Sequence, residues 1–132
     1  MTLKQYAALC HRKGPKGREV LLVTSSSGRW ILPKGWSIPG HSKAEAALVE
    51  AWEEGGIRKG KPKARPLGTF RSAKDGPKGT RVATEVTVYA VKVKKAVDSF
   101  PEADRRERRW VSPAKAAKLV SNKGLAKILR RF

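Results

Sequence analysis

The sequence predicts an α/β (α+β) fold that is built around a mixed β-sheet. Two features indicate this class: extended segments surround one central segment with helical spacing, and two further helical segments close the chain. The length of 132 residues fits a single domain, which we expect to span residues 1–132. A hydrophobic content of 39% is sufficient for one core.

The N-terminal part predicts three extended segments separated by turns. Residues 6–12 form the first expected strand, and the basic turn HRKGPKGRE follows it. The apolar run VLLVT, residues 20–24, is typical of a buried strand. After the turn SSSGR, residues 30–32 resume an extended segment. Residues 33–40 contain two prolines and two glycines, so they predict a loop.

A central helix is predicted over residues 43–54. Ser42 is a candidate N-cap with Glu45 three residues later, the spacing of a capping box, and a double glycine ends the segment. Small side chains share one face, which favours close packing on a sheet. These residues are Ala44, Ala47, Leu48 and Ala51. The roughly opposite face carries Glu50, Glu53 and Glu54.

The C-terminal half predicts strands first and helices last. Residues 64–72 read as a strand, AKDGPKGTR as a basic loop or hairpin tip, and residues 82–94 as a long alternating strand. A short strand at residues 108–111 precedes Ser112, which caps a helix starting near Pro113. The final segment SNKGLAKILRRF predicts a short, basic amphipathic helix.

The charge of the chain predicts a polyanionic partner. Its formal net charge is +19 with a pI of about 10.8, which favours a nucleic acid, a phosphorylated small molecule or an anionic surface. The chain has no apolar run long enough for a membrane span, and its N-terminus does not fit a signal peptide. Cys10 is alone, which excludes an internal disulfide and disfavours zinc. We therefore expect an intracellular, cytoplasmic protein.

The stretch from Gly35 to Ile57 contains the main functional signal. Glu50, Glu53 and Glu54 follow a glycine-containing loop at i, i+3 and i+4, so they form either a cation site or a solvated acidic face. The stretch resembles the Nudix box, G-x5-E-x7-R-E-U-x-E-E-x-G-U with U aliphatic. The positions that fit are Gly35, Glu50, Ala51, Glu53, Glu54, Gly56 and Ile57, whereas His41 replaces the first Glu and Val49 the Arg.

Two further segments resemble one branch of that family. VLLVTSSSGRWILPKG and RRERRWVSPAKAAKLV are similar to segments of the diphosphoinositol polyphosphate phosphohydrolases and their bacterial relatives. The branch usually has Glu directly before the tryptophan of the second segment, where this chain has Arg109. The resemblance implies a Nudix-type α/β/α sandwich with a central mixed sheet.

The resemblance also implies a chemistry and a cofactor. It predicts a pyrophosphohydrolase that depends on Mg²⁺, or alternatively Mn²⁺, and cleaves a phosphoanhydride bond in a highly anionic substrate such as a diphosphoinositol polyphosphate or dinucleoside polyphosphate. Glu50, Glu53 and Glu54 would bind the metal and carry catalysis, because a hard cation prefers oxygen ligands. Val49 cannot orient a carboxylate as the family arginine does, so the alternative is a catalytically weak domain that binds nucleic acid or a phosphorylated effector.

Basic, serine and aromatic side chains are the candidate substrate contacts. The set is Arg12, Arg18, Ser25, Ser26, Ser27, Arg29, Lys34, Gly35 and Trp36, with Lys13, Lys16, Arg71 and Lys74 as further cations for the mouth of the site. Trp36 is the candidate for stacking a base. His41 and Glu85 are additional site candidates, whose structural alternatives are a surface histidine and an ordinary salt bridge. The serines have the alternative of a polar turn.

The predicted partners follow from these features. The main partner is a phosphorylated small molecule, and nucleic acid is a second candidate through non-specific charge, for example at the basic helix Lys123 to Arg131. No zinc finger or RNP-like aromatic pair is present in the sequence, and we expect no membrane partner. The substrate, the oligomeric state and the identity of the general base are left open.

Overall fold

A mixed eight-stranded sheet forms the centre of the protein, whose structure is a computed structural model describing residues 2–132. The strands are β1 (Leu3–Gly14), β2 (Gly17–Thr24), β3 (Trp30–Ile31), β4 (Lys34–Gly35), β5 (Ile57–Pro62), β6 (Gly68–Asp75), β7 (Arg81–Ala96) and β8 (Arg108–Val111). The main order is β3-β2-β1-β7-β5, while β4 pairs with β1, β6 with β7 and β8 with β2. Only the β1–β7 pair is parallel among the described strand pairs.

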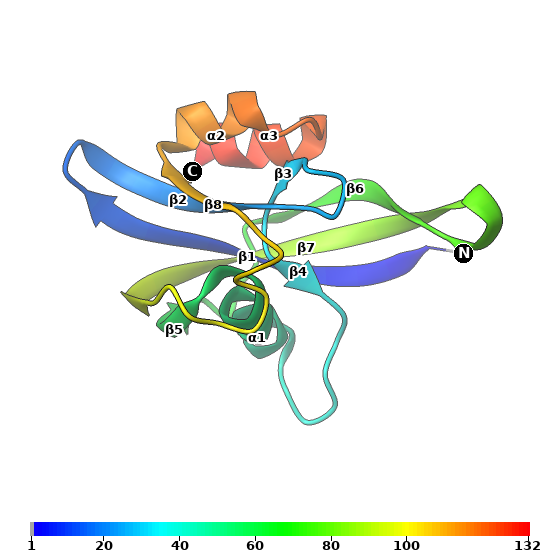
Figure 1. The fold of residues 1–132 in the computed structure, drawn as a ribbon, viewed down its shortest axis with the longest axis horizontal. Coiled ribbons are helices and arrows are strands. Elements are labelled where there is room, and N and C mark those ends of the chain that lie inside the picture. Colours follow the sequence, from blue (N-terminus) through cyan, green and yellow to red (C-terminus); the bar gives the residue numbers. More distant parts are fainter. Residues whose placement is uncertain (1) are drawn as a thin grey trace.

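Helices cover both faces of the sheet. Helix α1 (Lys43–Gly55) lies on one face, and α2 (Pro113–Leu119) and α3 (Lys123–Arg131) lie on the other, as Figure 1 shows. A 3₁₀ turn, η1 (Pro77–Gly79), forms the tip between β6 and β7. This α/β/α arrangement confirms the predicted fold class. No helix within residues 2–132 is both long and apolar enough to cross a membrane.

Two hydrophobic cores result from the alternation of side chains along the strands. On β1, Ala7 and Leu9 belong to the core beneath α2 and α3, whereas Ala8 and Cys10 belong to the core beneath α1. The small residues predicted for the packing face of α1 include Ala47 and Ala51, both fully buried. Burial without a charged partner raises the pKa of the Cys10 thiol to about 12.

Local capping explains where α1 begins and ends. The Glu45 N–H donates to Ser42 Oγ at 3.1 Å and the Ser42 N–H donates to Glu45 Oε1 at 2.7 Å, so the predicted capping box is confirmed. At the other end Gly56 adopts a φ of 73°, and a Cβ there would collide with the carbonyl oxygen of Val97. Glycine therefore lets the last turn of α1, with its glutamates, pack against the segment that follows β7.

Several predicted boundaries were wrong. The edge strand β5 was not predicted, because its sequence IRKGKP has neither apolar alternation nor β-branched residues after Ile57. The strand predicted at residues 64–72 is β6, which begins at Gly68 and ends at Asp75. The predicted loop over residues 33–40 contains the short strand β4, paired with Tyr6 and Ala7 of β1. These differences arise from pairing partners, which local sequence does not reveal.

Candidate active site

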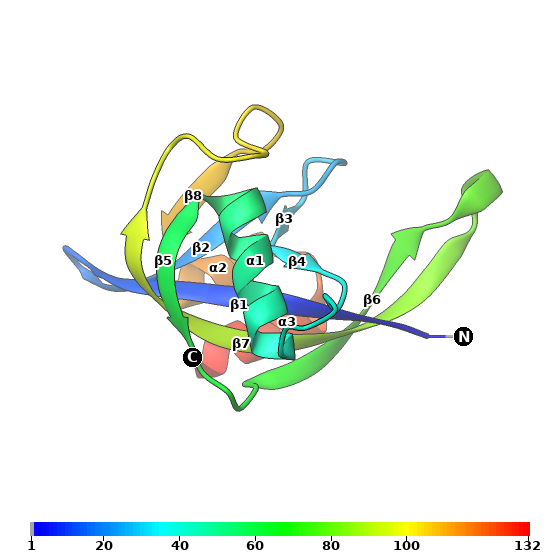
Figure 2. The same ribbon diagram turned by 90° about the horizontal axis from the view of Figure 1, so that it is seen from below.

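The last turns of α1 place two carboxyl groups against β4. Glu54 is only 6% exposed, and the backbone N–H of Lys34 donates to its Oε1 at 3.3 Å. At Gly35 an added Cβ would collide with the carboxyl group of Glu50, so glycine permits the close approach of strand and helix. Glu54 therefore does not lie on a solvated helix face. It is packed against the loop that precedes the helix. Figure 2 shows α1 and the adjacent β4.

The carboxyl groups of Glu50 and Glu54 influence each other's pKa. Burial is the largest influence on both, raising the pKa of Glu50 and raising that of Glu54 to about 8. Protonated Glu54 donates a hydrogen bond to the carboxylate of Glu50, which favours the ionised form of Glu50 and the neutral form of Glu54. Two adjacent carboxyl groups whose pKa values are both raised fit a divalent cation, because its charge would stabilise their ionised forms.

Glu53 stands apart from this pair. Its charge raises the pKa of Glu50, and its backbone carbonyl accepts the N–H of Glu102 at 3.0 Å. Within residues 2–132 no group of three or more His, Cys, Asp or Glu side chains is arranged to hold a metal ion. The predicted trio is therefore present as a close pair plus a neighbour. Mg²⁺ retains several waters and is often bound through one or two carboxylates, so the pair still fits this ion.

Arg106 is the functional candidate that sequence reasoning missed. Its Nη2 lies 3.7 Å from Glu54 Oε2, its Nε donates to Glu102 at 2.8 Å, and its Nη1 donates to the carbonyl of Thr24 at 2.7 Å. Its charge lowers the pKa of both Glu50 and Glu54, which burial raises. Arg106 thus supplies an orienting cation beside the carboxyls, although the box position for arginine holds Val49. The run RRERR contains the residue but does not single it out.

Further cations surround the carboxyl pair. Lys34 is half-buried, and its ammonium group donates to Gln5 Oε1 at 3.3 Å. Burial lowers the pKa of Lys34, Glu54 opposes this, and the charges of Arg29, Arg106 and Lys74 lower the pKa further. This local crowding of positive charge favours binding of an anion next to the carboxyls.

A cavity of about 300 Å³ adjoins Lys34 and collects part of the predicted substrate set. Ser25, Arg29 and Lys34 all line it, together with Arg81 and Asn122. Ser25 Oγ accepts the backbone N–H of Arg29 at 3.1 Å, so this hydroxyl also stabilises the turn. The cavity therefore presents three cationic side chains, one of which, Lys34, belongs to the residue whose backbone N–H contacts Glu54.

Ser26, Ser27 and Trp36 of the predicted substrate set do not line this cavity. Ser27 Oγ accepts from Arg29 Nε at 3.2 Å, and Ser26 is exposed in the same turn; neither serine lines the cavity. Trp36 is 42% exposed, and the ammonium group of Lys74 lies 4.8 Å from the centre of its ring. Trp36 therefore lies outside the lining, in contact with one of the cations that influence Lys34.

Arg12 and Arg18 are not brought to this site. Arg12 Nε donates to Glu19 at 2.9 Å, and its guanidinium lies 3.9 Å from the centre of the Trp110 ring. Arg18 donates to the carbonyl of Phe132 at 2.6 Å. On β1, Arg12 stands five positions beyond Ala7, the partner of Lys34, which corresponds to roughly 17 Å. The structure places both arginines at a different end of the sheet.

His41 and Glu85 are also separate from the carboxyl pair. His41 is exposed just before α1, and its backbone N–H donates to the carbonyl of Ile38 at 3.0 Å. About two turns of helix, roughly 10 Å, separate the start of α1 from Glu50. Glu85 lies on β7 between Lys4 of β1 and Arg71 of β6 in register. It therefore has cationic neighbours within the sheet.

Comparison with known proteins adds sequence relatives. The model of the NUDIX domain matches residues 3–132. Nudix hydrolase 12, mitochondrial, of Arabidopsis thaliana is 33% identical over 86% of this chain and 58% of its own length. Human diphosphoinositol polyphosphate phosphohydrolase 3-alpha is 34% identical over 89% of this chain and 68% of its own length. The chain thus spans little more than half the length of the Arabidopsis relative.

Solved structures share the fold. An Ap4A hydrolase of C. elegans in a binary complex superposes with a TM-score of 0.71 and 22% identity, covering 99% of this chain and 95% of that one. The NUDIX domain of Shewanella oneidensis NrtR, complexed with ADP ribose, has a TM-score of 0.67 and 17% identity, covering 99% and 87%. With the family model over nearly all of the chain and curated relatives one third identical, the chain belongs to the Nudix hydrolase family.

Proposed function

We propose that this protein is a pyrophosphohydrolase that depends on a divalent cation and cleaves a phosphoanhydride bond in a highly anionic small molecule. The observation that carries the proposal is the Glu50–Glu54 pair, in which Glu54 is buried and in contact with the backbone of Lys34, a residue that also lines a cationic cavity. Such a pair is costly to ionise without a counter-charge, and a phosphoanhydride is difficult to attack without one. One cation would satisfy both requirements.

Glu50 and Glu54 are the residues that would hold Mg²⁺, or alternatively Mn²⁺. When bound, the ion would neutralise phosphoryl charge and lower the pKa of a bound water. Arg106 would keep the Glu54 carboxylate oriented through its fixed contacts to Glu102 and to the carbonyl of Thr24. Glu53 lies next to the pair without being part of its hydrogen bond, so it stays a candidate for a ligand or a general base.

The cationic cavity supports a substrate with several phosphates. Arg29, Lys34 and Arg81 can contact phosphoryl oxygens there, and a guanidinium can do so through two parallel hydrogen bonds. Relatives and neighbours are named for diphosphoinositol polyphosphate and Ap4A, and these two compound classes are the substrates we propose. Trp36 is exposed and in contact with Lys74, and it would meet the non-phosphate part of such a molecule.

Arg106 favours this enzymatic function over the alternative of a weakly active binding domain. The alternative rested on the loss of the box arginine at Val49, whereas a cation from another segment lies 3.7 Å from the box glutamate Glu54. Phosphate release from dinucleoside polyphosphates, diphosphoinositol phosphates, nucleotide sugars and nucleoside triphosphates tests the choice. We expect hydrolysis of at least one of the first two classes, dependent on Mg²⁺. Binding of these compounds without turnover at any Mg²⁺ concentration would support the alternative.

A further inference from the structure

A second concave surface lies at the end of the sheet where Arg12 and Arg18 are found. We call it the basic groove. It measures about 1380 Å³ and lies across the ends of β2, β1, β7 and β5, four neighbouring strands. Figure 1 shows the β1–β2 hairpin and the end of β7 extending beyond α2 and α3. The cations used below are Arg12, Lys13 and Arg18 from the hairpin and Lys63, Lys92 and Lys94 from the opposite side.

The basic groove carries one sign of charge. Nine lysine and arginine side chains line it, and no acidic residue does. Among the described residues only Arg12 of these nine has an acidic partner, Glu19. These charges also act on His11. Burial is the largest cause that lowers the pKa of His11, and the charges of Arg18, Lys92 and Lys63 lower it further. Such unbalanced charge destabilises the free protein, and a bound polyanion would relieve it.

Two of these arginines are held in place by aromatic rings. The guanidinium of Arg12 lies 3.9 Å from the centre of the Trp110 ring, and that of Arg18 lies 4.2 Å from the centre of the Phe132 ring. Together with the hydrogen bonds of Arg12 Nε to Glu19 and of Arg18 Nη1 to the Phe132 carbonyl, these cation–π contacts fix each guanidinium group, whose other N–H groups can still donate to a ligand. The lysines on the opposite side are exposed and form no ion pair among the described residues, so one wall of the groove has positioned arginines and the other has solvated lysines.

The dimensions of the groove favour a chain over a compact ligand. Its volume of about 1380 Å³ exceeds the range of roughly 300–1,000 Å³ that is typical of small-molecule sites. Four strands at a spacing of about 4.8 Å make it roughly 14 Å across, enough for several phosphates of one strand. Its concave shape does not match a flat membrane surface. The lining contains no Phe, Tyr or Trp and no amide side chain to read a base edge.

We propose that the basic groove binds single-stranded nucleic acid through its phosphate backbone, without sequence preference, at a site separate from the catalytic carboxyls. The separation is roughly 17 Å along β1 between Arg12 and the partner of Lys34. Binding there is thus independent of the proposed hydrolysis, and the two functions can fail separately.

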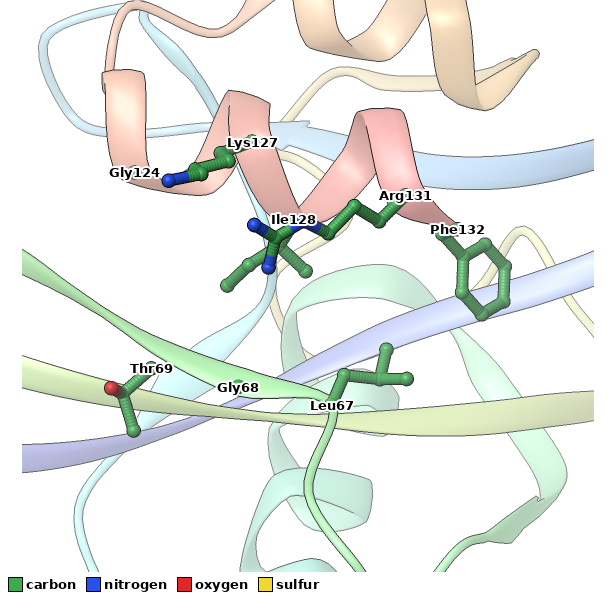
Figure 3. A pocket seen from close by; sticks show the side chains of 8 residues that line it. All are labelled: Leu67, Gly68, Thr69, Gly124, Lys127, Ile128, Arg131 and Phe132. Carbon is green, nitrogen blue, oxygen red and sulfur yellow. The ribbon is translucent and has the colours of Figure 1, made fainter.

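A smaller cleft between α3 and β6 offers the main structural alternative for nucleic acid. It measures about 400 Å³ and has only two cations in its lining, Lys127 and Arg131, which Figure 3 shows opposite Leu67 and Thr69. Because this cleft has fewer charges and a smaller volume, we expect it to bind a phosphate chain more weakly than the basic groove does. Helices α2 and α3 nevertheless supply lysines for a matched control.

The test compares two triple variants with equal loss of charge. The groove variant is Lys63→Gln, Lys92→Gln and Lys94→Gln, and the helix variant is Lys118→Gln, Lys123→Gln and Lys127→Gln. All six lysines are exposed. Anisotropy of two labelled 12-nucleotide single-stranded DNAs of unrelated sequence is measured over a range of salt concentrations. We expect wild type to bind both DNAs similarly, with affinity that falls as salt rises.

The expected difference lies in the salt dependence. For single strands each phosphate contact contributes about 0.7 to the slope of log K against log salt, so the groove variant should lose about 2 in slope. The helix variant should keep the wild-type slope, and both variants should keep wild-type phosphoanhydride hydrolysis. Equal losses in the two variants would overturn the groove assignment in favour of diffuse charge. Binding of inorganic polyphosphate or anionic vesicles but not of DNA would overturn the choice of ligand.

Discussion

The carboxyl pair on α1 and the basic groove present opposite electrostatic situations within one small protein. Glu54 is 6% exposed and in contact with a backbone N–H and a guanidinium, yet its pKa is raised to about 8. The groove cations Lys63, Lys92 and Lys94 are exposed and form no ion pair among the described residues. Burial makes a few charges at the carboxyl pair strongly coupled, whereas water and salt weaken the many charges of the groove.

The largest expected effect is the loss of a carboxylate from the pair. Glu54→Gln and Glu50→Gln should each lower kcat by more than about 100-fold, because even residues that only orient a metal ligand contribute roughly 10- to 100-fold. Glu53→Gln should cost less than either, since Glu53 lies outside the shared hydrogen bond. Steady-state kinetics at saturating Mg²⁺ measure this order. Normal turnover by a folded Glu54→Gln variant would show that the carboxyl pair is not part of the active site.

Gly35→Ala should disturb the same pair through packing. The added Cβ would collide with the Glu50 carboxyl group, so either β4 or Glu50 must shift. Overpacking of this kind typically costs about 1–3 kcal/mol of unfolding free energy. We expect a lower melting temperature together with a raised metal requirement. Gly79→Ala, a glycine with open space but a φ of 75°, serves as the control: it should alter stability while leaving the metal requirement unchanged.

Arg106 provides a test of the orienting cation. Arg106→Ala should lower kcat/KM by roughly 10- to 100-fold, as expected for a residue that orients a metal ligand. Its charge lowers the pKa of Glu54, so its removal should also shift the acidic limb of the pH–rate profile to higher pH. Adding Val49→Arg to this variant should recover activity, because it restores the family's arginine. A variant with reduced rate but an unmoved profile and no recovery would assign Arg106 a purely structural role.

The pH dependence of stability should distinguish the pair from ordinary carboxylates. The folded pKa of Glu54, about 8, lies above the ordinary value of 4.5, so the folded state binds more protons between these values. The free energy of unfolding of the metal-free protein should therefore fall as pH rises from about 5 to 8. Denaturant titrations measure it. The fall should be smaller in Glu54→Gln and should be reversed by Mg²⁺ at pH 8; a rise with pH in wild type contradicts the assignment.

The smallest expected effect is that of the groove charges on the KM of hydrolysis. The sequence suggests Arg12, Lys13 and Lys16 as cations of the substrate site, and their joint neutralisation tests that assignment. Because Arg12 lies roughly 17 Å from the partner of Lys34, beyond the screening distance of about 8 Å at physiological ionic strength, we expect KM to change less than about twofold. A KM that rises with the number of substrate phosphates would show that the two regions act together.

Local patterns predicted the elements that the site depends on. The capping box at Ser42, the small-residue face of α1 and the glycine after it are all encoded within one short stretch, and the structure contains each of them. These features were predictable because their causes lie within a few residues of one another.

Features that depend on distant segments were not predictable. Arg106 reaches Glu54 from a segment 52 positions later in the chain, within a run of similar arginines. The sequence left open whether Glu54 lies in a cation site or on a solvated face, and the burial of Glu54 by β4 and the segment after β7 depends on distant parts of the chain. Arg12 and Arg18 were assigned to the site by charge alone, and charge carries no information about which end of a strand a residue occupies.

Metal titration calorimetry tests the central claim, that the Glu50–Glu54 pair exchanges a proton for a divalent cation. Mn²⁺ is titrated into the metal-free protein at pH 7 in two buffers with different ionisation enthalpies. We predict release of about one proton per bound ion, because the ion requires the ionised form of a carboxyl whose pKa is raised to about 8. In Glu54→Gln both the proton release and most of the affinity should be lost. Binding with no proton release, and with equal affinity in Glu54→Gln, would contradict the account.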